Sequence, residues 1–177
     1  MSAMRRALSS RDPLHDPEPL IRRVYAYVAY RIGHGADADD ITSETFARAL
    51  RYRDTYAAAK GTPISWLIGI ARRCVDESFN QPRTSSDPPD GASSGDLASE
   101  AVDRLTLRAA VSQLGDRDRE LIALRYGADL SAREIAQRLE LSTNAVEVAL
   151  HRARSRLRAA LEGQPSDDAP RSSTPAV

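Results

Sequence analysis

Apolar residues recur at steps of three and four along two stretches of the chain, residues 19–80 and 99–162. This spacing is typical of amphipathic helices, and no stretch shows the alternation with period two that marks a half-buried strand. Glycine and proline divide the first stretch at Gly33, Gly35 and Pro63. We therefore expect three helices there, with apolar positions Leu20, Ile21, Val24, Tyr27, Val28 and Ile32; Ile41, Phe46, Ala49 and Leu50; and Trp66, Leu67, Ile70, Ala71, Cys74 and Val75.

The second stretch predicts four helices by the same reasoning. Gly115 and Gly127 end the first two. Ser131 and Glu134 have the spacing of a capping box, so a short third helix begins there, and Ser142 is a suitable cap for the last helix. The apolar positions are Leu105, Ala109 and Leu114; Leu121, Ile122 and Leu124; Ile135 and Leu139; and Val146, Leu150, Ala153, Leu157 and Leu161.

The segments outside these stretches carry few apolar residues. Residues 81–98 contain three prolines, two glycines and five serines or threonines, which favours a flexible linker. Residues 163–177 have a similar composition, and residues 1–18 lack the apolar run of a secretory signal. We therefore expect an all-α protein with a flexible N-terminus, two small helical domains at 19–80 and 99–162, a flexible linker between them and a disordered tail.

Composition excludes several classes of site. The single cysteine, Cys74, rules out an internal disulfide or a multi-cysteine metal site, and His15, His34 and His151 are too scattered to suggest a metal centre. We find no nucleophile–base spacing, glycine-rich phosphate loop or metal motif, so we expect neither an enzyme nor a cofactor. No apolar run approaches the ~20 residues of a membrane span, which predicts no membrane insertion and a cytoplasmic location.

The end of the second stretch has the pattern of a helix-turn-helix, a short helix followed by a tight turn and a longer helix. Four arginines crowd the far half of the last helix, at Arg152, Arg154, Arg156 and Arg158. They suit contacts to DNA phosphates. They equally suit a solvated helix face whose cations are favoured near the C-terminus by the helix dipole. The charge pattern alone leaves both interpretations open.

Four segments resemble bacterial sigma factors of the sigma-70 family, especially the small extracytoplasmic-function (ECF) group. The segment LSAREIAQRLELSTNAVEVALHRARSRLR resembles the region that binds the promoter −35 element, and LGDRDRELIALRY resembles the helix leading into it. The segment DADDITSETFARAL resembles the helix that binds core polymerase, and PISWLIGIARRCVDESF resembles the segment that recognises and melts the −10 element. The resemblance implies a sigma factor that binds core RNA polymerase, directs it to promoters and helps open them.

The resemblance assigns core binding to one acidic helix. Asp40 and Glu44 share a face, and matching acids in the family pack on the clamp coiled-coil of the largest polymerase subunit, with Arg48 beside them. Dipole complementarity at a helix N-terminus is the alternative explanation for acids there, and it accounts for Asp37. Ser43 stands where the family usually has glutamine. The polymerase flap region is a further expected contact.

By the same resemblance, Trp66, Arg72, Arg73 and Asn80 would meet −10 DNA. Trp66 equally suits a core position on sequence grounds, and Arg73 stands where the family often has asparagine. The basic run that often follows this helix is missing, since the chain reads Ser-Phe-Asn-Gln over 78–81.

The residues expected at −35 DNA lie in and before the last helix: Ser142, Thr143, Asn144, Glu147, His151, Arg152 and Arg156. Asn144 is suited to bidentate contact with adenine, and Glu147 to a hydrogen bond from cytosine N4, while Arg152 and Arg156 would hold phosphates. Glu147 and Ala149 depart from the family, which usually has basic residues at both positions.

Two other function classes stay open. One is a stand-alone helix-turn-helix regulator, against which the near-neutral charge argues: residues 20–80 carry nine basic and seven acidic side chains, and residues 99–162 carry eleven and ten. The other is a helical protein–protein adaptor. An anti-sigma factor is a further partner that the resemblance allows.

Overall fold

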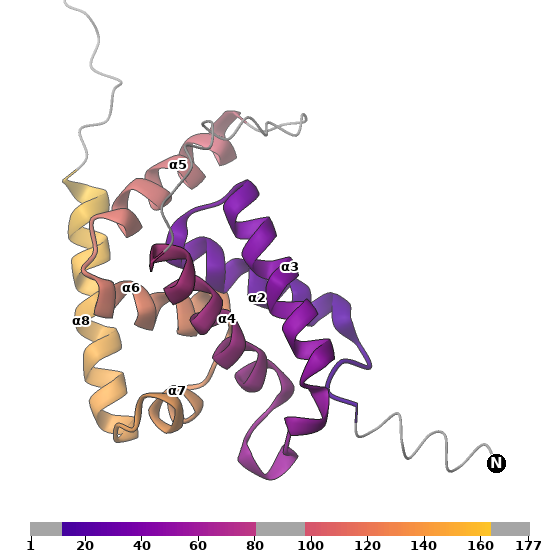
Figure 1. Ribbon diagram of the computed structural model, residues 1–177. Helices are drawn as coiled ribbons and strands as arrows, with labels where there is room; N and C mark the ends of the chain where they lie inside the picture. Colours follow the sequence, from indigo (N-terminus) through magenta and orange to yellow (C-terminus); the bar gives the residue numbers. More distant parts are fainter. Residues whose placement is uncertain (1–11, 81–97, 164–177) are drawn as a thin grey trace, which may run out of the picture.

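The protein, represented by a computed structural model, is described over residues 12–80 and 98–163, with side chains from residue 105 onward in the second range. Every regular element in these ranges is helical (Figure 1), which confirms the all-α prediction. The predicted N-terminal segment, linker and tail lie outside the described residues over 1–11, 81–97 and 164–177. The first range contains α2 (Pro17–Ile32), α3 (Ala36–Arg51), the 3-10 turns η1 (Arg53–Thr55) and η2 (Ala58–Lys60), and α4 (Pro63–Asn80). The second contains α5 (Ala98–Ser112), α6 (Asp116–Ile122), the π-helical turn η3 (Ala123–Gly127), α7 (Ala132–Leu139) and α8 (Thr143–Glu162).

The predicted start and stop signals act where the sequence places them. Gly33 ends α2 at φ +98° and Gly35 precedes α3 at φ +119°, conformations that side chains with a Cβ rarely adopt. Helix α2 begins at Pro17, two residues before the predicted domain boundary. Ser131 and Glu134 form the predicted capping box at the start of α7, so two of the four free N–H groups of that helix end are satisfied.

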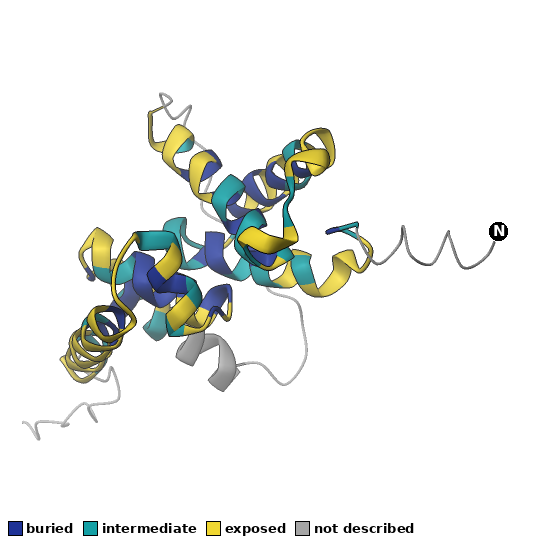
Figure 2. Cartoon of the chain, turned by 90° about the horizontal axis from the view of Figure 1, so that it is seen from below, coloured by how far each residue is buried: buried dark blue, intermediate teal, exposed yellow. Residues whose placement is uncertain are grey.

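Helix α2 belongs to the first predicted domain and lies at the centre of the fold, where it meets helices of both domains. It packs against α3 and α4 on one side and against α6 and η3 on the other. Its buried Val24, Tyr27 and Val28 join a single apolar cluster that also contains Leu67 of α4 and Leu124 of η3. The dark-blue buried residues in Figure 2 accordingly lie inside both groups of helices. The helices of the two predicted domains therefore share one core.

A buried polar network crosses this shared core. The Tyr27 hydroxyl donates to both carboxylate oxygens of Glu120 at 3.1 Å, although the two residues lie 93 positions apart. Arg31 Nε stands 3.0 Å from Glu120 Oε2, but its N–H is not directed at the oxygen, so the contact is an ion pair without a hydrogen bond. Burial, reinforced by the Glu120 charge, raises the pKa of Tyr27 far above its ordinary value, so the phenol remains a donor.

Two leucines predicted at inward positions point to solvent instead. Leu50 is 60% exposed because it follows the core residue Ile41 by nine positions, which places it about half a turn away around α3. Leu105 is 63% exposed because α5 buries its C-terminal end, at Ala110 and Val111, rather than its middle.

The shared core predicts that both groups of helices unfold together. We expect Leu67→Ala in α4 and Leu124→Ala in η3 each to destabilise the chain by about 2–5 kcal/mol, because both side chains are fully buried. Scanning calorimetry should show one transition in the wild type, shifted to lower temperature as a whole in each variant. Two transitions, of which each substitution moves only one, would contradict a common core.

Candidate functional site

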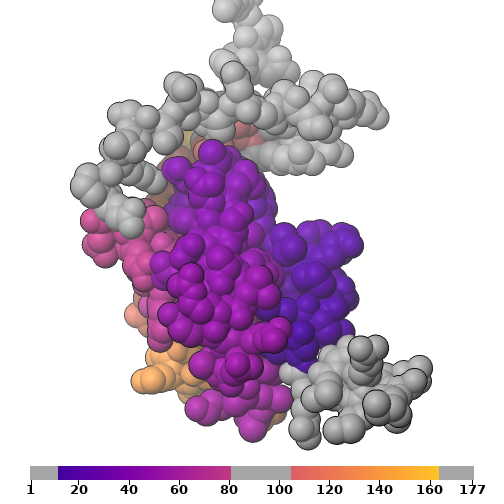
Figure 3. All heavy atoms as spheres, turned by 45° about the vertical axis from the view of Figure 1, so that its right-hand side comes forward, coloured from indigo at the N-terminus to yellow at the C-terminus, as the bar shows by residue number. Residues whose placement is uncertain are grey.

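One face of α3 is exposed along the whole helix. Asp40, Ser43, Ala47 and Leu50 follow one another at steps of three and four, and all four are exposed. We call these four residues the α3 stripe. It is acidic toward the N-terminus of the helix and apolar toward the C-terminus, and α3 forms the middle of the surface seen in Figure 3. The stripe suits a partner surface that offers both basic and apolar groups.

The expected core-binding residues divide into two groups in the structure. Asp40 lies in the α3 stripe, and within the described residues it forms no ion pair. Glu44 instead accepts from Arg48 Nε at 2.6 Å, and Arg48 also donates to both carboxylate oxygens of Glu77 on α4, at 2.9 and 2.7 Å. These hydrogen bonds hold the pKa of Glu77 below its ordinary value. Arg48 therefore ties α3 to α4, whereas Asp40 is available to a partner.

The expected −10 residues lie along the exposed face of α4, with Trp66 and Arg73 on one edge and Arg72 on the other. Arg73 lines a cavity of about 570 Å³ between α3 and α4, together with Trp66, Ile70 and Glu77. Trp66 is half-buried, and its ring lies 5.7 Å from that of Tyr56. Both interpretations of Trp66 thus describe part of its position, since it packs against the core and also faces the cavity.

The other two expected −10 residues lie away from that cavity. Arg72 is exposed on the opposite edge of α4, and Asn80 in its last turn donates its side-chain amide to the Asp76 carbonyl at 3.0 Å. Phe79 beside it is 53% exposed. Phe79 was not selected from the sequence as a site residue, although its apolar character in a polar segment could have indicated it.

The helix-turn-helix forms as predicted. A short turn joins α7 to α8, in which Glu140 adopts a left-handed conformation at φ +55°. The Ser142 hydroxyl then accepts the Ala145 N–H at 3.1 Å, which caps α8. Ser142 therefore has a capping role whatever it contacts in DNA.

The outward face of α8 carries most of the expected −35 residues. Val146, Leu150 and Ala153 are buried, and the opposite side exposes Asn144 and His151 with Val148 between them. The remaining expected positions that are exposed are Thr143, Glu147 and Arg152. Val148 was not selected from the sequence, although its place between Asn144 and Arg152 at steps of four could have indicated it.

Arg156 lies on a different side of α8 from Asn144. Its guanidinium is 2.5 Å from Asp118 of α6, whose side chain is only 15% exposed. Arg156, which was predicted to hold a DNA phosphate, thus fastens α8 to α6. Ala149, where the family usually has a basic residue, is half-buried and packs against the core.

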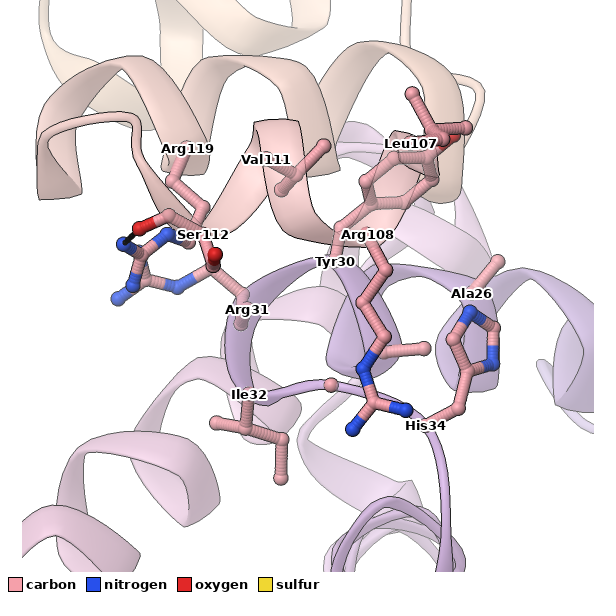
Figure 4. A pocket seen from close by; sticks show the side chains of 12 residues that line it. Ala26, Tyr30, Arg31, Ile32, His34, Leu107, Arg108, Val111, Ser112 and Arg119 are labelled. Carbon is pink, nitrogen blue, oxygen red and sulfur yellow. Dashed lines mark hydrogen bonds between the residues drawn. The ribbon is translucent and has the colours of Figure 1, made fainter. Parts of the chain in front are cut away.

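A second cavity, of about 360 Å³, lies where the end of α2 meets α5 and α6 (Figure 4). Its lining includes the apolar side chains of Tyr30 and Val111 and the guanidinium groups of Arg31, Arg108 and Arg119. Two of these cations are already engaged, Arg31 with Glu120 and Arg119 with the carbonyls of Ser112 and Leu114.

Each of the two groups of helices matches a known protein family in sequence. Residues 18–81 match sigma-70 region 2, and residues 104–157 match sigma-70 region 4. The ECF RNA polymerase sigma factor SigK of Mycobacterium ulcerans is 30% identical over 151 residues, which cover 80% of this chain and 77% of SigK. The chain belongs to the ECF sigma factors of the sigma-70 family.

Other relatives of this sigma factor agree with that assignment. The ECF sigma factor BldN of Streptomyces coelicolor is 32% identical over 139 residues, 73% of this chain, and the alignment spans only 53% of BldN. Two solved structures share the fold. RpoE of Bartonella quintana, bound to the anti-sigma factor NepR, gives a TM-score of 0.61 at 18% identity over 82% of this chain and 94% of its own. CnrH, bound to the cytosolic domain of CnrY, gives 0.61 at 21% identity over 89% and 96%.

The described residues of this sigma factor were also compared with what a metal site or a membrane span requires. Across residues 12–80 and 98–163, no three side chains of the metal-binding types gather into a site. None of the helices described there combines the length and apolar content that a bilayer crossing requires. Cys74 is buried, in agreement with its prediction as a core residue.

The ion pair of Arg156 predicts a structural effect of its removal. We expect Arg156→Ala to lower the free energy of unfolding by up to about 1 kcal/mol, because it leaves the largely buried Asp118 carboxylate without its partner. Arg152→Ala, the matched control on the same helix, should leave stability unchanged. Urea denaturation of the two variants and of Asp118→Ala measures this, and equal stability of all of them would mean that the pair does not form in solution.

Proposed function

We propose that this sigma factor binds core RNA polymerase through the α3 stripe and directs it to promoters through α4 and α8. The observation that supports this most is the arrangement of the two matched regions. Each presents an exposed helical face of the expected residue types, and α3 and α8 lie on opposite sides of the molecule (Figure 1). We infer that the role is non-catalytic and that the sigma factor acts as a recognition subunit.

The α3 stripe is the proposed surface for the clamp coiled-coil of the largest polymerase subunit. Asp40 would supply the charge that a basic partner surface requires, while Ala47 and Leu50 would bury apolar area. Glu44 contributes less in this proposal than the sequence suggested, because Arg48 already neutralises it.

The outward face of α4 is the proposed path of the −10 strand. Arg73 and Trp66 at the cavity between α3 and α4 would pair with a phosphate and stack on an unstacked base. Arg72 and Asn80 would contact the same DNA strand outside the cavity that Arg73 and Trp66 line.

The outward face of α8 is the proposed reader of the −35 element. Asn144 lies in the first turn of α8, at the end that enters a major groove in helix-turn-helix proteins. It would read adenine, Val148 would contact a thymine methyl group, and Arg152 would hold a phosphate. Glu147, Thr143 and His151 are exposed beside them.

Two further partners fit the proposal. The polymerase flap region would contact the region 4 domain. An anti-sigma polypeptide would suit the cavity between α2 and α5, where Arg108 is exposed beside apolar lining and favours an acidic segment. This partner is suggested by RpoE and CnrH, which were both solved bound to such polypeptides.

One experiment separates this function from a stand-alone regulator and from a protein–protein adaptor. The chain is co-purified with core polymerase, and the reconstituted enzyme transcribes a genomic library. We expect stoichiometric co-purification and transcripts from a limited set of promoters. Tight binding to duplex DNA without polymerase would support the regulator, and co-purification without new transcripts would support the adaptor.

Core binding should depend on the α3 stripe. We expect Asp40→Arg combined with Leu50→Asp to weaken association with core polymerase by at least tenfold, because the pair reverses the charge and removes the apolar area of the stripe. Glu18→Arg, an exposed charge reversal on α2, is the control. Surface plasmon resonance measures the affinity for core polymerase, and circular dichroism establishes that the variants are folded. Wild-type affinity of the double variant would exclude the α3 stripe as the core-binding surface.

Sequence preference at −35 should depend on Asn144. We expect Asn144→Ala polymerase to lose about 1–3 kcal/mol of discrimination at one −35 position, because a bidentate base contact is removed. Arg152→Ala should instead weaken all promoters alike. In transcription from a randomised −35 library, an unchanged preference for Asn144→Ala would assign base reading to another residue.

A further inference from the structure

The cavity where the end of α2 meets α5 and α6 is cationic as well as apolar. Three arginines line it, Arg31, Arg108 and Arg119, and the described residues of its lining include no aspartate or glutamate. Its volume of about 360 Å³ lies at the small end of the range that organic ligands occupy in proteins. Excess positive charge attracts anions, so a cavity of this size and charge suits a small anionic molecule better than a neutral one.

The three arginines of the cavity differ in how far they are already neutralised. Arg31 forms an ion pair with Glu120 at 3.0 Å. Arg119 lies 3.6 Å from a carboxylate oxygen of Asp116. Arg108 is exposed, and it has neither an ion pair nor a hydrogen bond with any residue that the structure describes. Arg108 is therefore the cation of this cavity that a ligand can neutralise, and one such cation matches a ligand with one negative charge.

The position of Arg108 depends on the absence of a side chain at Gly33. Arg108 Nη2 lies 3.0 Å from the place where a Cβ on Gly33 would stand, so the guanidinium rests directly over the end of α2. In Figure 4 the Arg108 side chain extends from α5 toward His34, away from Arg31 and Arg119. A side chain at Gly33 would compete for this space. The glycine thus allows α5 to place a positive charge at the edge of the cavity, where solvent reaches it.

The rest of the lining supplies apolar surface and one further donor. Val111 is buried, Tyr30 and Leu107 are half-buried, and all three side chains line the cavity (Figure 4). The Tyr30 hydroxyl has no hydrogen-bond partner among the described residues. Burial raises the pKa of Tyr30, so this hydroxyl keeps its proton and is available as a donor. A ligand that fits this lining has an apolar body and a polar end.

We propose that the cavity between α2 and α5 binds a small monocarboxylate with an aromatic or aliphatic body, and that the carboxylate pairs with Arg108. A guanidinium binds a carboxylate through two parallel hydrogen bonds, and its single charge matches a carboxylate better than a doubly charged phosphate monoester. The cavity shares no lining residue with the surfaces proposed for polymerase and DNA, so this inference does not rest on the function proposed for them.

A bound monocarboxylate would compete with the acidic polypeptide segment proposed for the same cavity. Both need Arg108, and one guanidinium accommodates one carboxylate in the bidentate arrangement. The small molecule differs in that its apolar body would enter the cavity, beside Tyr30 and Val111, rather than remain on a helix outside it.

Phenylbutyrate and phenylbutyramide test the proposal, because they share an aromatic body and differ in charge. Isothermal titration calorimetry with the full chain should show the carboxylate binding at least tenfold more tightly than the amide. Arg108→Ala should weaken phenylbutyrate binding by at least tenfold, as expected for the loss of a charged hydrogen-bond partner, and leave the amide unaffected. Arg22→Ala is the matched control, an exposed arginine of α2 that pairs within its own helix, and should bind as the wild type.

A second variant tests the cavity rather than the charge. Ala26→Leu adds apolar volume to the lining from α2 and changes no charge, so it should abolish binding of both compounds. Ala47→Leu, at an exposed position of α3, is its control and should leave binding unchanged. Circular dichroism establishes that each variant is folded, and if Ala26→Leu is not, the exposed Arg108 decides.

Nuclear magnetic resonance of the labelled chain then locates the bound compound. Phenylbutyrate should shift the amide signals of Gly33 and Val111, which line the cavity. The proposal is overturned if neither compound binds, if both bind equally, if Arg108→Ala binds phenylbutyrate as the wild type does, or if the shifted signals lie elsewhere. A glutamate-rich helical peptide that binds through Arg108 when phenylbutyrate does not would assign the cavity to a polypeptide and overturn the proposal as well.

Discussion

The contact on which the rest of the structure depends is the packing of η3 against the backbone of α2 at Gly127. Because Gly127 has no side chain, the two chain segments approach closely enough for α2 to be buried on both sides. That burial merges two small helical groups into one core and places Glu120 where Tyr27 and Arg31 satisfy it. Each group alone is small and would bury little apolar area, so it would be only marginally stable. The shared core supplies what each lacks.

The local structure was predictable because its causes are local. Helical periodicity, the glycine stops and the capping box at Ser131 and Glu134 depend on residues within one or two turns, and all were recognised from the sequence. The packing between the groups was not predictable in this way. Periodicity identifies an inward face but not its partner, and Tyr27 meets Glu120 across 93 residues. Gly127 was predicted to end a helix, and nothing near it in the sequence indicates that it faces the backbone of Tyr27.

The same distinction explains which of the expected site residues have the exposure that their proposed roles require. Motif resemblance assigned the site residues to α3, α4 and α8, and Asp40 and Asn144 are exposed as their proposed roles require. Resemblance gave no information on side chains that the fold uses internally. Arg48 is held by two glutamates, and Arg156 by Asp118. A charge pattern along a helix does not show which cations are already paired, so these two arginines needed the tertiary structure.

The formal net charge of zero has a physical consequence for DNA binding. A domain that binds DNA alone needs excess cations to displace counterions. Here α4 and α8 carry six arginines, but the chain as a whole has as many acidic as basic side chains, and Arg156 is tied to Asp118. The balanced charge therefore disfavours binding of the free chain to DNA. Polymerase binding would remove this limit by supplying cations of its own.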